Sequence, residues 1–415
     1  MTGTTGGSTG TATSGGSATS SSGTTGVITT TGSTTGSSGS GGTSGTTTGG
    51  AQADHSPVVI GNVSTTSGIA GGAQRPGVVG LQAWVQMVNA NGGVNGHQIR
   101  LIARDDQADP SQNASYTQAL VEQSHVLAFV SNWASQTQQA SAGYLKSKQI
   151  PVVGGDHTAQ QSWGVNPMFF PVASVREDAV RNGVAGLAKV AADKRNLGIL
   201  VCAESAICTD GAKIAAAFAP KVGFKVVYNG SASFASPSYT AECLNMKNAG
   251  VQAVDMIFPA SATRNVARDC VRQGLKVIYA LANGTMEGDF NKDPNFEGSA
   301  VIHSAFPFSG GVGPVPQEYE AAMKKYQPNQ ISNPAAAAGF AAGVVFGTAL
   351  AKVQGPVTTA KLLAALYTFK NDTFGGATIP LTYVKAPMTP GKCFFLSVIR
   401  SRSYVPLNGS RSLCV

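Results

Sequence analysis

The sequence predicts an α/β protein with two consecutive parallel β-sheets, preceded by a segment that forms no packed core. From Pro57 onward, short runs of β-forming residues alternate with longer helical patterns, which is typical of βαβ units. The alternation starts again after Pro171, which indicates a second sheet. The first fifty residues contain 18 Thr, 16 Gly and 11 Ser and no charged residue. They bury too little apolar surface to offset the entropy lost on ordering, so we expect a disordered tether over residues 1–56.

The first sheet is expected to begin with a strand at residues 58–60, which leads into a loop rich in Gly and Ser that ends near Gly72. The next helix should begin near Pro76, because a proline in the first turn needs no N–H partner. It should end at Asn91-Gly92-Gly93, where paired glycines allow a left-handed C-terminus. The later elements of this series are strands at 99–103, 127–130 and 150–153 and helices at 111–123 and 136–146.

In the second series strands and helices alternate in the same way. The strands are expected at 197–201, 225–228, 254–258 and 276–280, and the helices at 177–190, 212–218, 239–248 and 264–273. The remainder is richer in helices, at 318–326, 335–353 and 359–369, and ends in strand-like segments at 377–384 and 394–399. The uncharged stretch 335–351 is only 17 residues long and rich in Ala and Gly. A membrane span needs about 20 strongly apolar residues, so we expect a buried helix.

The charge pattern argues against a nucleic-acid binder. The net charge is +8, but charged residues make up only 12% of the chain, and no run of five or six Lys or Arg appears. The nearest approach to a basic cluster is formed by Arg400, Arg402 and Arg411. Nucleic-acid binders concentrate basic charge on one face or helix, so we expect a mildly basic, solvated surface.

Motifs for cofactors, metals and catalysis are absent from the sequence. The first strand is followed by Gly61-Asn62-Val63-Ser64 rather than by the glycine pattern of a dinucleotide site, and the P-loop string does not occur. The five histidines are scattered, without metal-like spacing. We therefore expect no cofactor, no metal and no enzymatic activity. A secreted hydrolase is the open alternative, because a Ser–His–Asp group need not be close in the chain.

Six cysteines form three neighbouring pairs along the chain, without C-x-x-C spacing. An even number suits an oxidising compartment, where disulfides persist. The hypothesis is three disulfides, Cys202–Cys208, Cys243–Cys270 and Cys393–Cys414. The alternative is six free thiols in a cytosolic protein.

Residues 89–96 read N-A-N-G-G-V-N-G, and residues 99–106 read I-R-L-I-A-R-D-D. In this order they resemble type I periplasmic solute-binding proteins, and more narrowly the branched-chain amino-acid (leucine/isoleucine/valine) binding family of ABC transporters. Supporting segments lie at 131–141, 150–158, 208–211 and 374–376. The resemblance extends from Pro57 to about Tyr383.

The resemblance implies two Rossmann-like lobes joined by three crossover strands, the periplasmic binding protein-like type I or Venus-flytrap fold, which closes on a ligand by a hinge. The N-terminal lobe would comprise residues 57–171 and about 306–377. The C-terminal lobe would comprise 172–305 and about 378–415. Crossovers are expected near Phe170-Pro171, near 305–307 and around Thr378.

In the first lobe, the resemblance implies that two loops hold the carboxylate of the ligand through backbone N–H groups and hydroxyls. These loops are Trp133-Ala134-Ser135 and Asp156-His157-Thr158. Ser135 and Thr158 keep the expected hydroxyls, whereas Ala134 stands where the family often has Ser. Trp133 is interpreted either as a wall of the ligand pocket or as a hydrophobic plug beneath the loop.

In the second lobe, the expected ligand contacts depart from the family pattern. Cys208 stands where relatives often have Tyr, and Ser261 lies in a loop of small residues. Asn283 stands where amino-acid binders commonly have Glu. A neutral amide leaves a buried ammonium unpaired, which is costly. Either another acid pairs with the ammonium, or the ligand is not a standard α-amino acid. The candidate acids are Asp156, Glu204 and Asp289, and Arg75 is either a carboxylate ligand or an exposed helix-start residue.

The resemblance predicts an extracytoplasmic receptor that delivers an amino acid or a related small carboxylate or amide to the permease subunits of an ABC importer. We expect a monomer whose membrane contact is limited to an N-terminal anchor, with a signal peptide or lipid attachment preceding Met1. The alternatives are a ligand-sensing regulator of the amide-binding type and, for the Gly/Ser/Thr segment alone, non-native coding sequence.

Overall fold

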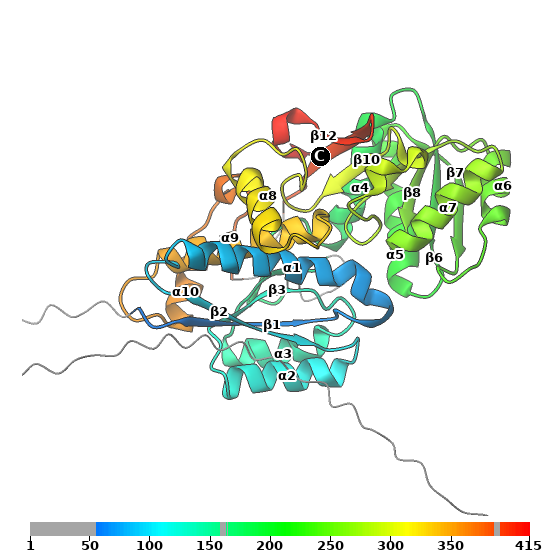
Figure 1. The fold of residues 1–415 in the computed structure, drawn as a ribbon. Helices are drawn as coiled ribbons and strands as arrows, with labels where there is room; N and C mark the ends of the chain where they lie inside the picture. Colours follow the sequence, from blue (N-terminus) through cyan, green and yellow to red (C-terminus); the bar gives the residue numbers. More distant parts are fainter. Residues whose placement is uncertain (1–54, 158–162, 164, 386–390) are drawn as a thin grey trace, which may run out of the picture. The chain divides into compact units, whose positions relative to one another are not determined.

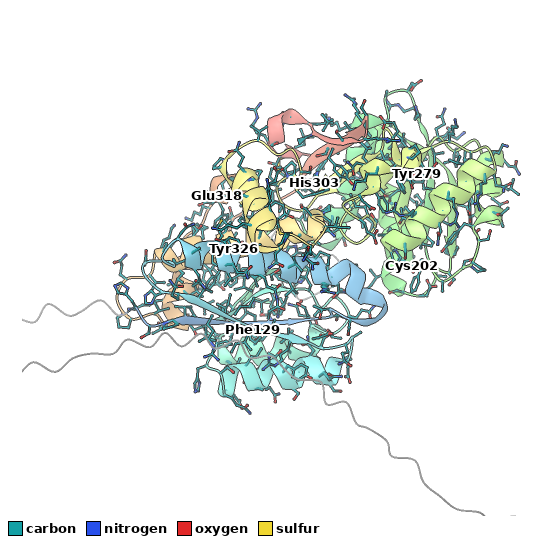
Figure 2. All side chains as sticks on the ribbon, in the orientation of Figure 1. Phe129, Cys202, Tyr279, His303, Glu318 and Tyr326 are labelled. Atoms are coloured by element: carbon teal, nitrogen blue, oxygen red, sulfur yellow. A yellow bond between two sulfur atoms is a disulfide. The ribbon has the colours of Figure 1, made fainter. Side chains whose placement is uncertain are left out.

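A computed structural model describes residues 55–157, 163, 165–385 and 391–415. The tether predicted over residues 1–56 therefore lies almost entirely outside the described residues. The strands from Val58 onward form two sheets, as the sequence predicts. Phe129 lies in the first sheet, and Tyr279 and His303 lie in the second (Figure 2).

The first sheet is parallel throughout and has the strand order β2-β1-β3-β4-β5. Its strands are β1 (Val58–Ser64), β2 (Ile99–Asp105), β3 (Ala128–Asn132), β4 (Val152–Gly155) and β5 (Phe169–Phe170). The helices between them are α1 (Gly68–Ala90), α2 (Pro110–Glu122) and α3 (Gln139–Lys148). Helices α2 and α3 cover one face of this sheet, and α1 covers the other (Figure 1).

The second sheet has a parallel part in the order β10-β9-β8-β6-β7, to which an antiparallel C-terminal part is added next to β10. The parallel strands are β6 (Asn196–Cys202), β7 (Lys225–Ala232), β8 (Ala253–Ile257), β9 (Ile278–Leu281) and β10 (Ala300–His303). The antiparallel strands are β11 (Cys393–Arg400), β12 (Ser403–Pro406) and β13 (Leu413–Cys414). The α-helices are α4 (Arg176–Val190), α5 (Ala206–Phe218), α6 (Thr240–Asn248) and α7 (Ala260–Arg272).

The chain then forms α8 (Pro314–Tyr326), α9 (Pro334–Ala351) and α10 (Thr359–Leu366). Helix α9 packs on α1, β3 and β4, so this part of the chain completes the first lobe. Short 3-10 helices lie at η1 (Ala219–Val222), η2 (Phe290–Lys292), η3 (Pro294–Phe296), η4 (Phe374–Gly376) and η5 (Asn408–Ser410).

Helix α9 is the predicted buried helix. Among the described helices it is long and apolar enough to cross a membrane, but 83% of it is buried inside the structure. It meets α1 backbone to backbone: a Cβ atom on Gly80 would lie 1.8 Å from the carbonyl oxygen of Ala336. A Cβ atom on Gly339 would likewise lie 1.8 Å from the carbonyl oxygen of Gly77. The small residues of α9 therefore serve close helix packing.

The predicted start of the first helix is wrong. Helix α1 begins at Gly68, so Pro76 lies inside the helix rather than in its first turn. The glycines taken as loop signals belong to the helix, where Gly71 sits too close to the Thr66 carbonyl oxygen for a side chain.

The strand predicted at 377–384 is also absent from the structure. Its only ladder contact is a single bridge between Leu381 and Asp372. Tyr383 packs its ring on Phe170 and donates its hydroxyl proton to the Pro171 carbonyl oxygen at 2.9 Å. Pro380 has no N–H for a sheet ladder, which explains the irregular backbone. The third crossover, expected before or around Thr378, stays a prediction.

The structure contains three disulfides, and their pairs are those expected from the sequence. Cys202–Cys208 joins the end of β6 to α5 (Figure 2). Cys243–Cys270 joins α6 to α7, and Cys393–Cys414 joins β11 to β13. All three lie in the second lobe.

Candidate functional site

The candidate site lies at the carboxyl ends of the parallel strands, where open α/β sheets bind ligands. In the first sheet the chain passes from β1 to its neighbour β2 on one side, and from β3 to its neighbour β4 on the other side. The gap between β1 and β3 is therefore the topological switch point. The loops that follow them are joined by two hydrogen bonds. Thr65 N donates to the Trp133 carbonyl oxygen at 2.8 Å, and Trp133 N donates to Ser64 Oγ at 2.9 Å.

Trp133 lies beneath its loop rather than in a pocket wall. Its side chain is 3% exposed, and Nε1 donates to Ser131 Oγ at 2.8 Å. A Cβ atom on Gly77 would lie 2.0 Å from Nε1, so the indole packs directly on the backbone of α1. Of the two interpretations of Trp133, the geometry favours the hydrophobic plug.

Ser135 forms the centre of a buried polar cluster. Its Oγ accepts a hydrogen bond from Gln74 Nε2 of α1, which leaves the hydroxyl proton of Ser135 available for donation. Gln74 Oε1 and both amide atoms of the fully buried Gln138 have no partner among the described residues. Ala134, at the start of the turn, is fully buried and accepts hydrogen bonds at its carbonyl oxygen from Thr137 N and Gln138 N. Buried polar atoms are normally paired, so the unpaired amide atoms of Gln74 and Gln138 distinguish this part of the first lobe from an ordinary core.

The loop after β4 is described only in part, because Thr158 lies outside the described residues. Asp156 is half-buried, and its backbone N–H donates to the Asn132 carbonyl oxygen at 3.1 Å. His157 is buried: its Nε2 accepts from Val172 N at 3.3 Å, and its ring packs edge-on against Trp163 at 4.6 Å. Burial lowers the pKa of His157 to about 3, so the imidazole is neutral. These contacts do not support a ligand contact of the His157 side chain.

In the second lobe, the first predicted ligand contact is Cys208, which lies in a segment held by a disulfide. The Cys208 side chain is buried in its disulfide with Cys202, and no aromatic side chain takes its place. Ser261 is exposed in the first turn of α7. Backbone N–H groups at such a helix start are unpaired within the helix, so this end can take a polar or anionic group.

Asn283 follows β9, next to the end of β10. Its Nδ2 donates to Ser304 Oγ at 2.8 Å, whereas its Oδ1 is buried without a partner among the described residues. The amide therefore offers a carbonyl oxygen, not a charge.

Two of the candidate acids are engaged within the second lobe. Glu204 accepts from Ser233 Oγ at 2.6 Å and from Phe234 N at 2.9 Å, and the Ser233 hydrogen bond is the main cause that lowers the pKa of Glu204. Asp289 pairs with Arg264 at 2.8 Å. Both carboxylates therefore already have partners within the chain.

Arg75 is exposed on α1, not at a helix start as the sequence suggested. It lines a hollow of about 200 Å³ with Thr66, Pro76 and Gln330. No group of three or more His, Cys, Asp and Glu side chains placed to hold a metal ion occurs within the described ranges.

Sequence reasoning missed Gln74, Gln138 and Ser304. Gln74 and Ser135 are 61 residues apart, and Asn283 and Ser304 are 21 apart. Nothing in the local pattern distinguishes these side chains from ordinary surface residues, because only the tertiary fold buries them.

Comparison with known families agrees with this geometry. A family model described as periplasmic binding protein matches residues 57–396. The chain therefore belongs to the periplasmic binding protein family, and its fold is that of the type I members. This is a family of binding proteins rather than enzymes, and membership implies an extracytoplasmic location. A curated relative, an amino acid binding protein of Pseudomonas aeruginosa, is 33% identical over 84 residues, which cover 20% of this chain and 22% of that protein.

Solved structures with similar folds are described with different ligands. A branched-chain amino acid ABC transporter protein from Thermus thermophilus with bound valine has a TM-score of 0.73 at 17% identity, covering 88% of this chain and 98% of that one. A solute-binding protein from R. palustris in complex with benzoate has a TM-score of 0.67 at 14% identity, covering 86% and 98%. A fatty acid ABC transporter substrate-binding protein from Thermomonospora curvata has a TM-score of 0.69 at 16% identity, covering 88% and 95%. At these identities the likeness shows the fold alone.

Proposed function

We propose that the chain is the solute-binding receptor of an ABC importer, which captures a small polar ligand between its lobes and presents the closed form to permease subunits. The observation that carries this proposal is the buried polar cluster at Ser135, at the switch point of the first sheet, in a member of the periplasmic binding protein family. Ligand contacts to both lobes exist only in the closed state, so binding shifts the open–closed equilibrium.

The first lobe suits a carboxylate or an amide. Ser135 has a hydroxyl proton to donate near the carboxyl end of β3. Relatives that share the fold bind valine and benzoate, both carboxylates. The narrower assignment to branched-chain amino acids rests on the sequence resemblance, but the second lobe offers Asn283 where an ammonium needs an acid.

We place the N-terminal lobe at 57–171 and about 306–377 and the C-terminal lobe at 172–305 and about 378–415, the bounds that the resemblance implies. Residues 1–56 are proposed as a tether to a membrane anchor. Ser135, Asp156, Thr158 and Ser261 are retained as proposed ligand contacts, together with Asn283.

The test is a thermal-shift screen of the purified full chain against amino acids, aromatic carboxylates, amides and ureas. A ligand at 100 times its Kd stabilises the folded state by about 2.7 kcal/mol, so a binder raises the Tm. Small-angle scattering with the best binder should show a smaller radius of gyration. The proposal fails if no compound in these classes raises the Tm, or if a bound ligand leaves the radius unchanged.

Ser135→Ala checks the assigned site. Removing a hydrogen bond to a charged group costs about 1.5 kcal/mol, so a carboxylate ligand should bind roughly tenfold more weakly. Ser147→Ala, the same change at an exposed position of α3, is the matched control. Equal ligand affinities of the two variants would show that Ser135 does not contact the ligand.

A further inference from the structure

The amino ends of the parallel strands in the second sheet form an edge that lies opposite the candidate site. The register places the starts of neighbouring strands side by side: Asn196 of β6 pairs with Lys225 of β7, and Leu197 of β6 pairs with Ala253 of β8. Ala253 pairs in turn with Ile278 of β9. We call this edge the base of the second lobe. It consists of the residues next to and within the turns 191–195, 219–224, 249–252 and 273–277.

The base gathers cations from separate parts of the chain. They include Lys194, Arg195, Lys221, Lys225, Lys247 and Lys276. All are exposed except Lys194, which is half-buried. Lys247 Nζ donates to the Gln273 carbonyl oxygen at 2.8 Å, and within the described part of the chain none of the six forms an ion pair. Asp193 is the single acidic residue of the four turns.

The basic edge continues into the C-terminal strands. Strand β11 runs antiparallel to β10, so its end lies at the same edge as the start of β10. Arg400 and Arg402 lie in the connection from β11 to β12, and both are exposed. Glu297 is also exposed here and accepts from Ser401 N at 2.9 Å. The small basic cluster near the C-terminus of the sequence is therefore one end of a longer edge that only the fold assembles.

The base keeps a net positive charge after the helix dipoles are counted. Helices α4 to α7 run toward the base, and each helix carboxyl end carries about −0.5 elementary charge. Four such ends, with Asp193 and Glu297, offset only part of the eight Lys and Arg side chains on this edge. Acidic side chains of the lobe lie at the other end of the same helices: Glu177 and Asp178 in the first turn of α4 and Glu242 in the first turn of α6.

The shape of the base decides which polyanion fits it. Neighbouring strands are about 4.8 Å apart, so the seven strands from β12 to β7 spread the cations over roughly 30 Å. Separated, flexible cations suit a broad surface of mobile anionic headgroups, which can move to meet each charge. Single-stranded nucleic acids instead stack on exposed aromatic side chains, and Phe224, the single aromatic residue of the four turns, is 3% exposed. The extracytoplasmic location of the family places the chain beside a membrane surface.

We propose that the base of the second lobe binds the anionic headgroups of a membrane surface. The contact lies at the opposite end of the strands from the candidate site, so it leaves the ligand site open to solvent. This interaction goes beyond the proposed function, because it is independent of the solute that the chain carries. It adds a contact through the folded lobe to the proposed N-terminal tether.

Co-sedimentation of the purified full chain with lipid vesicles tests the contact. Vesicles of phosphatidylcholine alone are compared with vesicles that contain about 30% phosphatidylglycerol, at about 0.1 M salt. We expect the anionic vesicles to bind the chain at least about tenfold more tightly than the neutral vesicles. This binding should be lost at about 1 M salt, because the Debye length falls from about 10 Å to about 3 Å. A short DNA duplex serves as the competing polyanion.

Two variants of equal net charge locate the contact. The base variant carries Lys194→Gln, Lys221→Gln, Lys225→Gln and Lys276→Gln. The control variant carries the same change at four exposed lysines of the first lobe, Lys146→Gln, Lys324→Gln, Lys325→Gln and Lys370→Gln. Each cation near an anionic surface contributes roughly fivefold in affinity, so the base variant should bind anionic vesicles at least about tenfold more weakly than the control. Both variants should keep the Tm shift caused by a ligand.

The other outcomes overturn the proposal in distinguishable ways. If the unaltered chain does not bind anionic vesicles, the membrane contact is wrong and the receptor function is unaffected. Equal vesicle binding by the two variants would show that the attraction follows net charge alone rather than the base. Binding of the DNA duplex that depends on the base, without binding of the vesicles, would assign this edge to a nucleic acid instead of a lipid surface.

Discussion

Asp255 makes the second lobe sensitive to pH. It lies in the middle of β8, between Ile199 of β6 and Ala280 of β9, and is 5% exposed. Its Oδ1 would lie 3.5 Å from a Cβ atom on Gly183 of α4, and its Oδ2 has no hydrogen-bond partner among the described residues. Burial without a partner raises the pKa of Asp255 to about 7 from the ordinary 3.8.

The magnitude follows from the difference between the folded and unfolded pKa values. Roughly three pKa units correspond to about 4 kcal/mol at full effect. The folded state holds the proton more tightly, so Asp255 lowers the free energy of unfolding as pH rises from about 4 to about 7. Below this window Asp255 is protonated in both states, and above it the destabilisation is complete.

Two buried histidines act in the opposite direction. Burial lowers the pKa values of His157 and His303 to about 3 from the ordinary 6.5. Their neutral folded forms contribute stability above pH 6.5 that is lost progressively as pH falls toward 3. In the unaltered chain the free energy of unfolding therefore changes with pH through opposing contributions. The contribution of Asp255 is isolated by comparing the unaltered chain with a variant at this position.

Asp255→Asn keeps the size of the side chain and removes the charge. We expect the stability difference between the variant and the unaltered chain to grow in favour of the variant by about 1.4 kcal/mol per pH unit between pH 4.5 and 6.5. At pH 8 the net gain should be about 1–3 kcal/mol, because the unpaired amide itself costs about 1–3 kcal/mol. Urea unfolding at four pH values measures the difference, with the exposed Asp193→Asn as the control. A difference independent of pH would refute the reasoning.

Two further predictions concern packing and covalent linkage. Gly339→Ala places a Cβ atom 1.8 Å from the Gly77 carbonyl oxygen and should destabilise the chain by about 2 kcal/mol or more in urea unfolding, whereas Gly143→Ala, with open space around it, should be neutral or slightly stabilising. Replacing both Cys243 and Cys270 by Ala removes a link that closes 27 residues and should lower the free energy of unfolding by about 3.5 kcal/mol. An unchanged urea midpoint in either variant would contradict the corresponding argument.

The two sheets could be predicted because buried parallel strands leave a strong pattern. Strands such as β6 and β8 are short apolar runs flanked by helices, so their alternation alone indicates the fold class. Strand β10 was missed because its four residues follow a glycine-containing turn and read as part of a loop. The start of α1 was misplaced because the glycines that permit its close packing are also the commonest loop signal.

The sequence points to candidate site residues that follow strands and does not point to those that only the fold buries. Ser135 and Asn283 follow strands directly, so the topology brings them to the mouths of the sheets. His157 also follows a strand, but its ring turns into the core against Trp163, and neighbouring residues at a strand end need not face the same way.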